Sequence, residues 1–382
     1  MSRNFRRSKL TLVPVLLVLL LVLPACSEGP SAQANAADPS SFAGLEPQLN
    51  KITEQLRELL EKFQTASPAE QVEIARQHDA LAGELKTLLP KVQAAAESEL
   101  KTQPDAASAQ KNFLYIMVSD RIGSDDYEEA DRLARLLLDQ QVNLPRLRDM
   151  AGMAAFMTND FDRAAKLFGE AAEEGTLSDL GRSFRSQIAY YKKLWKEEQA
   201  FRAAEAEADD LPRVKFETNK GDIVLELFEN EAPNTVANLI SLVDKKYYDG
   251  VTFHRVLPRL MAQGGCPDGT GGGGPGYTIR CECLKQPHRK HFRGSLSMAK
   301  QEDPHTGGSQ FFLCFAPAQQ LDGMHTVFGR VIEGLDVLSE LQRRNPLDRA
   351  QLGIQPDKIL KATVLRRRDH EYQPETVPDP GR

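Results

Sequence analysis

An arginine set among apolar residues is the feature of this sequence that most needs a chemical explanation. Arg255 lies in the apolar run 253–257, which predicts a strand, and Gln263 follows shortly after it. A buried charge is costly unless it is paired or used. Two later segments, residues 307–312 and 321–329, bring a glutamine, three phenylalanines, an aspartate and a histidine. We interpret these segments as parts of one site.

In this order the three segments resemble the cyclophilin family of peptidyl-prolyl isomerases. The resemblance implies that Arg255 is the catalytic arginine and that Gln263 orients it. Rotation about an X-Pro bond faces a barrier of about 18–20 kcal/mol because amide resonance must be broken. No bond is made in this reaction, so the implied site needs no nucleophile, metal or cofactor. A fixed guanidinium aimed at the prolyl nitrogen stabilises the twisted amide over both planar forms.

The resemblance also assigns an apolar pocket for the proline ring. The family positions for this pocket are occupied by Met261, Phe312 and Leu321, and His325 matches the histidine beside it. Leu260 also contributes, although the family usually has a phenylalanine there. We therefore expect a working but slower site.

A second group of residues is implied to hold the rest of the peptide. Ala299 and Lys300 match the strand that holds the peptide backbone, and Gln310 lines the neighbouring groove. Lys300 replaces the usual asparagine, although main-chain contacts could survive that change. Gln320 stands where eukaryotic members carry a tryptophan, which the resemblance links to tight cyclosporin binding. We expect weak inhibition by cyclosporin.

The N-terminus has the pattern of a targeting signal. Basic residues precede an apolar run from Leu10 to Leu23. A helix needs about 20 residues to span a bilayer, and this run is shorter. The run ends in Leu-Pro-Ala-Cys at residues 23–26, which looks like a bacterial lipobox with Cys26 as the lipidated residue. A secretory signal cleaved nearby and an uncleaved anchor are the alternatives.

This pattern predicts an exported, membrane-anchored lipoprotein facing the periplasm. Ser27 follows the cysteine, where an inner-membrane lipoprotein would carry an aspartate, so the outer membrane is favoured by resemblance to Gram-negative lipoproteins. Two or more acyl chains make such attachment stable.

Composition and periodicity divide the chain into five segments. Residues 1–25 are the predicted signal peptide, 26–44 a flexible tether, 45–211 a helical region, 212–372 a cyclophilin-like domain and 373–382 a disordered tail. The first helices form a hairpin or coiled coil, separated at Ser67 and Pro68. The predicted fold is α+β and multidomain. A helical TPR-like region is followed by a domain that the resemblance implies is a cyclophilin-like closed eight-stranded β-barrel with two flanking helices.

The helical region contains one recognisable repeat. Small and apolar residues recur 34 residues apart, as Tyr127, Ala130, Ala134 and Leu137 and then as Phe161, Ala164, Phe168 and Ala171. This period and the glycine at Gly152, where close helix packing needs a small side chain, resemble the tetratricopeptide repeat. A helical bundle with chance spacing is the alternative.

From residue 212 the apolar period changes to two. A hairpin is predicted over 214–227, a helix from Glu231 to Tyr247, a second helix from Gly334 to Arg344 and a last strand from Ile359 to Arg366. The glycine-dense segment Gly269–Gly276 lacks the lysine of a phosphate loop. It looks like the flexible loop that family members carry beside the active groove.

Four cysteines follow Cys26, namely Cys266, Cys281, Cys283 and Cys314. Cys314 is interpreted as a small core residue. Cys281 and Cys283 precede His288 and His291, which are residue types that zinc accepts, but the spacing matches no known finger. Loop residues, or a disulfide from Cys266 to Cys281 or Cys283, are the favoured interpretations.

Charge and composition limit the partners. The net charge of −6 argues against a general nucleic-acid binder, which would carry a basic face. The first hypothesis is a membrane-tethered isomerase acting on proline-containing exported proteins, with the helical region binding clients or partners. The second is a catalytically weak proline-binding scaffold or chaperone module. In the third, the helical region carries the main function.

Overall fold

The computed structural model describes residues 38–105, 107–348, 351 and 353–378. The predicted signal peptide and Cys26 lie outside these residues. The described chain divides into two compact units, one of residues up to 123, 128–154 and 167–178, and one of residues 124–127, 155–166 and 179 onward. No helix within the described ranges is long and apolar enough to span a bilayer.

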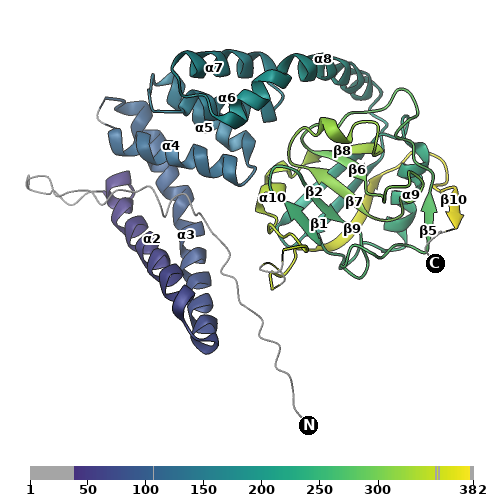
Figure 1. Cartoon of the computed structure of the whole chain (residues 1–382), viewed down its shortest axis with the longest axis horizontal. Helices are drawn as coiled ribbons and strands as arrows, with labels where there is room; N and C mark the ends of the chain where they lie inside the picture. Colours follow the sequence, from purple (N-terminus) through teal and green to yellow (C-terminus); the bar gives the residue numbers. More distant parts are fainter. Residues whose placement is uncertain (1–37, 106, 349–350, 352, 379–382) are drawn as a thin grey trace, which may run out of the picture. The chain divides into compact units, whose positions relative to one another are not determined.

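The N-terminal part is helical, as expected (Figure 1). The helices are α2 (Phe42–Thr65), α3 (Pro68–Thr102), α4 (Ser108–Gly123), α5 (Tyr127–Asp139), α6 (Leu147–Met157), α7 (Phe161–Glu173) and α8 (Asp179–Ala208). The break between α2 and α3 follows its sequence signal. The Glu70 carboxylate accepts hydrogen bonds from the backbone N and the hydroxyl of Ser67, and Pro68 opens α3.

The repeated small and apolar positions of α5 and α7 are buried. A Cβ atom on Gly152 would lie 2.7 Å from the ring of Phe168, so α6 and α7 approach closely only because this residue is glycine. The helices and the close contact are confirmed, while membership of the tetratricopeptide family stays a prediction.

The C-terminal part is built on one curled antiparallel sheet. Its strands are β1 (Arg213–Thr218), β2 (Gly221–Leu227), β3 (Arg255–Leu257), β4 (Met261–Gly264), β6 (Ser295–Met298), β7 (Phe311–Cys314), β8 (Val327–Glu333) and β9 (Ile359–Arg366). They form an eight-stranded sheet in the order β3-β4-β7-β6-β8-β2-β1-β9. A bridge joins Thr252, ahead of β3, to Lys358, ahead of β9. The curled sheet confirms the expected class, and full closure of the barrel stays a prediction.

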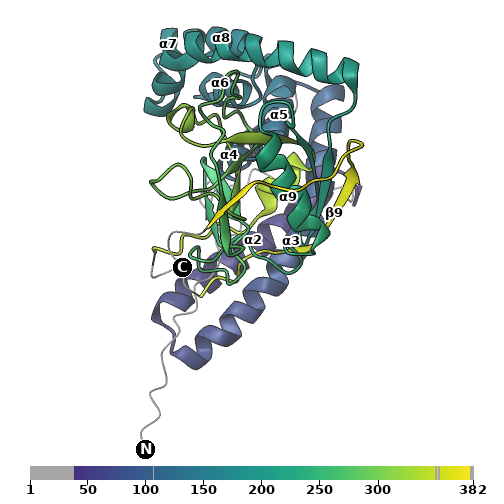
Figure 2. The same ribbon diagram turned by 90° about the vertical axis from the view of Figure 1, so that its right-hand side faces the viewer.

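Aromatic side chains fill the inside of the sheet. Phe216, Phe253, Phe311 and Phe328 are fully buried in one apolar cluster. Helix α9 (Pro233–Asp244) covers this cluster and lies beside β9 (Figure 2). Helix α10 (Leu335–Glu340) is shorter than predicted because Leu341 adopts an extended backbone.

The predicted disordered tail is wrong for residues 376–378. Strand β10 (Thr376–Pro378) pairs antiparallel with β5 (Tyr277–Ile279). The side chain of Asn234 donates to the carbonyl of Glu375 and accepts from its N–H, at 3.1 and 2.7 Å. These contacts hold residues 375–378 in place. The partners, β5 and Asn234, lie far away in the sequence, so the tail sequence alone does not reveal them.

Candidate functional site

The arginine and glutamine singled out in the sequence face each other across a hairpin. Strands β3 and β4 pair with Arg255 opposite Gln263 and Leu257 opposite Met261. Strand β4 then pairs with β7, which places Phe312 opposite Gln263. The residues of the first and second predicted segments therefore form one row across neighbouring strands.

Arg255 is half-buried and has no ionic partner among the residues that the structure describes. Its Nε atom is buried and makes no hydrogen bond. Most buried polar atoms are paired, so an unpaired one at a cleft marks a position kept for a ligand or for chemistry. The guanidinium is thus available to a bound molecule.

The side chain of Gln263 is engaged elsewhere than expected. The resemblance implied that it orients Arg255, whereas its Nε2 donates to Oε1 of Gln310 at 3.0 Å. Gln310 in turn donates to the carbonyls of Gly271 and Gly273, at 2.8 and 2.9 Å. The glutamine pair ties the strand that faces Arg255 to the glycine-rich loop.

A small apolar cluster lies on β4 and β7, next to the strand that carries the arginine. Met261, Phe312 and Cys314 form a small buried cluster, against which partly buried residues pack, namely Leu257, Leu260, Ala299 and Leu321. This cluster is separate from the main core inside the sheet. The structure therefore brings together the residues predicted for the proline ring, with Leu260 among them, and confirms Cys314 as a buried residue.

His325 lies against one side of this cluster. Its ring lies edge-on to Phe312, with centroids 5.4 Å apart, and its Nδ1 is 3.0 Å from the carbonyl of Met298. Burial lowers the pKa of His325, with the charge of Lys300 acting in the same direction. The imidazole is therefore neutral near pH 7 and donates from Nδ1 to the carbonyl.

Sequence reasoning missed a second histidine behind the pocket. His291 is fully buried, and its ring stacks on Phe312 with centroids 5.8 Å apart. Its Nδ1 is 2.8 Å from Asp322 Oδ1 and its Nε2 is 3.0 Å from the hydroxyl of Ser297. His291 was considered only as a zinc ligand, although Asp322, close to Leu321 in the sequence, was a signal for this support.

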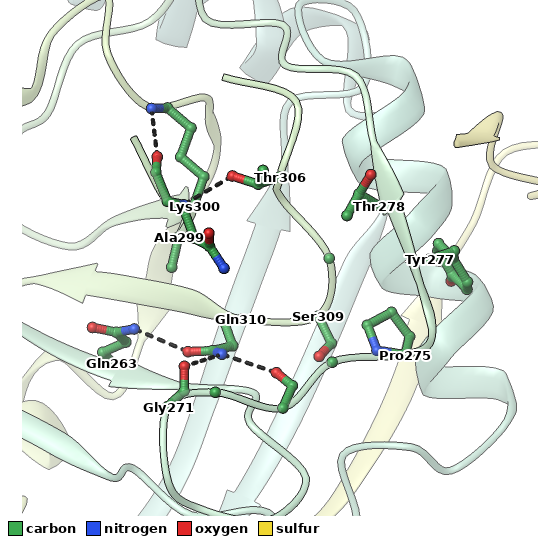
Figure 3. A pocket seen from close by; sticks show the side chains of 15 residues that line it. Gln263, Gly271, Pro275, Tyr277, Thr278, Ala299, Lys300, Thr306, Ser309 and Gln310 are labelled. Atoms are coloured by element: carbon green, nitrogen blue, oxygen red, sulfur yellow. Dashed lines mark hydrogen bonds between the residues drawn. The ribbon is translucent and has the colours of Figure 1, made fainter. Parts of the chain in front are cut away.

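A polar groove of about 180 Å³ adjoins the pocket (Figure 3). Its lining comes from the glycine-rich loop, β5 and the ends of β6 and β7, and includes Gln263, Gly271, Tyr277, Ala299, Lys300 and Gln310. Lys300 Nζ donates to the carbonyls of Gln301 and Glu302, at 3.1 and 3.4 Å, so its charge is held by its own loop. The loop 269–276 thus lies beside the groove, as expected.

The four described cysteines are free thiols. Cys281 Sγ lies 2.9 Å from Cys283 Sγ, while Cys266 Sγ contacts Asp268, so the expected link from Cys266 to either of them is not formed. Within the described ranges, no group of three or more histidine, cysteine or acidic side chains is arranged to hold a metal.

Comparisons with known proteins point to one family. A family model described as "Cyclophilin type peptidyl-prolyl cis-trans isomerase/CLD" matches residues 213–364. A peptidyl-prolyl cis-trans isomerase of Synechococcus elongatus is 54% identical over 129 residues, 33% of this chain and 86% of that protein. One of Helicobacter pylori is 52% identical over 130 residues, 34% of this chain and 78% of that protein.

A solved structure of a Cryptosporidium parvum cyclophilin type peptidyl-prolyl cis-trans isomerase was also matched. The two chains share 31% sequence identity. The superposition covers 41% of this chain and 99% of the Cryptosporidium chain, with a TM-score of 0.38.

Proposed function

Because this chain belongs to the cyclophilin-type peptidyl-prolyl cis-trans isomerases, we propose that Arg255 is the residue that accelerates rotation about X-Pro bonds. Peptidyl-prolyl isomerase activity itself follows from the family. The roles of the individual residues are our proposal. The observation that carries it is the half-buried guanidinium whose Nε makes no hydrogen bond, on the strand beside the apolar cluster of Met261, Phe312 and Cys314.

The mechanism follows from what changes when the amide twists. Twisting makes the prolyl nitrogen pyramidal and gives it a lone pair, to which a guanidinium N–H can donate. The planar forms lack this acceptor, so the hydrogen bond from Arg255 stabilises the twisted state alone. Met261, Phe312 and Leu321 hold the proline ring, and the amide dipoles of the groove hold the preceding residues. An acceleration of about 10⁵-fold requires about 7 kcal/mol of such differential binding.

The direct test is the cis-to-trans rate of an Ala-Pro peptide with the purified full chain and with Arg255→Ala. We expect the wild-type chain to be active and the variant to lose at least about tenfold in kcat/KM, because a charge-assisted hydrogen bond to the transition state is gone. Arg367→Ala is the matched control. Arg367 is an exposed arginine paired with Asp244, and its loss should leave the rate unchanged.

Two results would overturn the proposal. Equal rates for the wild type and Arg255→Ala would show that another group stabilises the twisted amide. A folded wild-type chain that binds a proline peptide without accelerating its rotation would support the scaffold hypothesis, for which the substitutions at Leu260 and Lys300 are the arguments.

We also propose that the protein is exported and tethered to a membrane through Cys26. The support is the basic and apolar N-terminus followed by Leu-Pro-Ala-Cys at residues 23–26. Proline-containing exported proteins are then its clients, and the helical region is available to bind them or other partners. Metabolic labelling with an alkyne fatty acid should mark the wild-type chain and not Cys26→Ser. Labelling of both would place the lipid elsewhere, and labelling of neither would exclude a lipoprotein.

A further inference from the structure

One carboxylate from the helical part of the sequence lies against the hairpin that carries the proposed catalytic residues. Asp125 belongs to the short segment 124–127, which joins α4 to the first residue of α5 and which the structure groups with the sheet. Asp125 is fully buried. Its carboxylate accepts hydrogen bonds from the backbone N–H of Arg259, with Oδ1 at 3.0 Å and Oδ2 at 3.2 Å.

We propose that Asp125 is a positioning residue for the isomerase site: it holds the amide of Arg259 and thereby fixes the turn that presents Leu260 and Met261 to the proline pocket. This inference rests on the proposed function of the pocket. It also gives a segment outside residues 212–372 a part in the site.

The turn needs such support because of its backbone conformation. Residues 258–260 join β3 to β4, and the N–H of Leu260 donates to the carbonyl of Leu257 at 3.2 Å. Pro258 precedes Arg259, whose φ is +58°. This is the pattern of a type II turn, which normally has glycine at its third position. A non-glycine residue there is strained and persists only where its surroundings hold it.

Asp125 supplies the acceptor that favours this orientation of the peptide. In the alternative type I turn the peptide plane between Pro258 and Arg259 is rotated, and its N–H points to the other side. The buried carboxylate would then lose a donor, which is costly for a charged group. The hydrogen bond therefore opposes the relaxation that the strain at Arg259 would otherwise favour.

The carboxylate is itself held by further donors. Arg343 Nη2 donates to Asp125 Oδ2 at 2.8 Å and to the carbonyl of Ser124 at 2.6 Å. The hydroxyl of Tyr127 donates to Oδ1 at 2.9 Å. The Arg343 guanidinium lies 4.5 Å from the ring centroid of Phe315, whose N–H donates to the carbonyl of Leu260 at 3.0 Å. These contacts hold the Asp125 carboxylate in place, and through Arg343 and Phe315 they also reach Leu260 on the other side of the turn.

A merely structural role predicts a different result from a positioning role. A structural carboxylate would change the stability of the chain and leave the kinetics of the folded molecules alone. A positioning carboxylate changes KM, because the turn carries two residues of the proline pocket. Its effect also depends on the strain at Arg259, because the carboxylate is needed only while that residue resists the left-handed conformation.

The experiment compares the full chain with four variants under conditions where each is folded. Asp125→Gly removes the acceptor and keeps the φ of +63° at no steric cost, while Asp125→Asn keeps an acceptor there. Asp125→Gly/Arg259→Gly removes the acceptor and the strain together. Asp149→Ala is the control, since Asp149 is another fully buried aspartate, on α6, in the other compact unit.

We expect Asp125→Gly to lower kcat/KM about tenfold, mainly through a higher KM. Asp125→Asn should lose less, Asp125→Gly/Arg259→Gly should recover most of the loss, and Asp149→Ala should keep wild-type KM even where its melting temperature falls. An unchanged KM in Asp125→Gly, or no recovery in the double variant, would overturn the proposal.

A parallel measurement separates this inference from the proposed function. Calorimetric binding of the same proline peptide reports on the pocket whether or not the chain turns the peptide over. If the wild-type chain shows no isomerase activity and Asp125→Gly binds the peptide more weakly than the wild type, the catalytic function is refuted and the positioning role is retained. If the wild-type chain is active and both proteins bind the peptide equally, the positioning role is refuted and the catalytic function is retained.

Discussion

Arg255 and Arg289 are both arginines of the unit that contains the sheet, and their surroundings are opposite. The Arg289 side chain is fully buried, with Glu198 Oε1 at 2.7 Å from Nη2, Glu231 Oε2 at 3.8 Å from Nη1, and Glu205 also bound to Nη1. Its guanidinium lies 3.6 Å from the ring centroid of Phe228. Among the residues that the structure describes, Arg255 has no carboxylate partner, and its Nε makes no hydrogen bond.

The difference separates a structural arginine from a functional one. Paired charges and the ring of Phe228 compensate the loss of hydration around Arg289, which fastens α8 to the segment between β5 and β6. Arg255 keeps part of its hydration, and the described part of the chain supplies no ionic partner for it. An activity assay and a stability assay should therefore rank the two residues in opposite orders.

The largest effect is expected for Arg289→Ala. Removing one partner from a buried charge cluster leaves the carboxylates uncompensated, so we expect a loss of about 3–5 kcal/mol in the free energy of unfolding. Urea denaturation of the full chain measures this loss, followed on a signal from the sheet-containing unit. Arg367→Ala, at an exposed pair, should cost less than about 1 kcal/mol. A loss below about 1 kcal/mol for Arg289→Ala as well would show that Arg289 does not stabilise the fold.

The next largest effect is expected from acid, which should lower the free energy of unfolding at different pH values through His254, next to Arg255, and through the cluster around Arg289. Burial, with the charges of Arg344 and Arg255, lowers the pKa of His254 from 6.5 to about 4. Between these values the unfolded chain binds a proton that the native chain does not, so stability rises with pH across this window and is lost as the pH falls. The shift corresponds to about 3 kcal/mol.

The Arg289 cluster responds at lower pH. Burial alone would raise the pKa of Glu198, but the hydrogen bonds and charge of Arg289 hold it below its ordinary value of 4.5. Glu198 therefore stabilises the native chain at pH values above 4.5, and this stabilisation is lost as the pH falls below 4.5. His254→Gln should therefore reduce the slope of stability against pH between 4 and 6.5 and keep the steeper loss below it. Identical slopes in the wild type and the variant would contradict the assignment.

A conservative change at Arg255 should have a smaller effect that appears in activity alone. Arg255→Lys keeps the positive charge and loses the planar fork, so we expect kcat/KM to fall about tenfold. The free energy of unfolding should stay within about 0.5 kcal/mol of the wild type, because Arg255 has no ionic partner to lose among the described residues. A lysine variant with full activity would show that charge near the prolyl nitrogen is sufficient.

The hairpin of β1 and β2, helix α9 and the last strand could be predicted from the sequence because they depend on local signals. The residues assigned to the proline pocket came from the resemblance of short segments to one family. Alternation, turn residues and the motif around Arg255 lie within short segments, and strand pairing brings those segments together as expected. The pairing of Gln263 with Gln310 could not be predicted, because a glutamine side chain can both donate and accept and its partner is not marked in the local sequence.

Contacts between distant segments were missed for a general reason. Asp125 and Arg259 are separated by 134 positions and Arg289 and Glu198 by 91, and nothing in either local sequence marks the partner. The same contacts show that a deletion of residues 45–210 removes more than a helical region. It also removes Asp125, Glu198 and the hydroxyl of Tyr191, which accepts from the N–H of Gln319 beside the pocket at 2.9 Å.

The smallest effect is expected for Leu260→Phe, which tests whether the pocket beside Arg255 is underfilled. Leu260 is only partly buried against Met261 and Phe312, so a larger ring can extend toward solvent without entering the core. The added ring surface contacts a bound proline, and we expect kcat/KM to rise about twofold to threefold. Leu365→Phe, at an exposed position of β9, is the matched control. A lower kcat/KM for Leu260→Phe would mean that the strained turn at Arg259 has adapted to leucine, and Leu260→Phe combined with Arg259→Gly would then recover the rate.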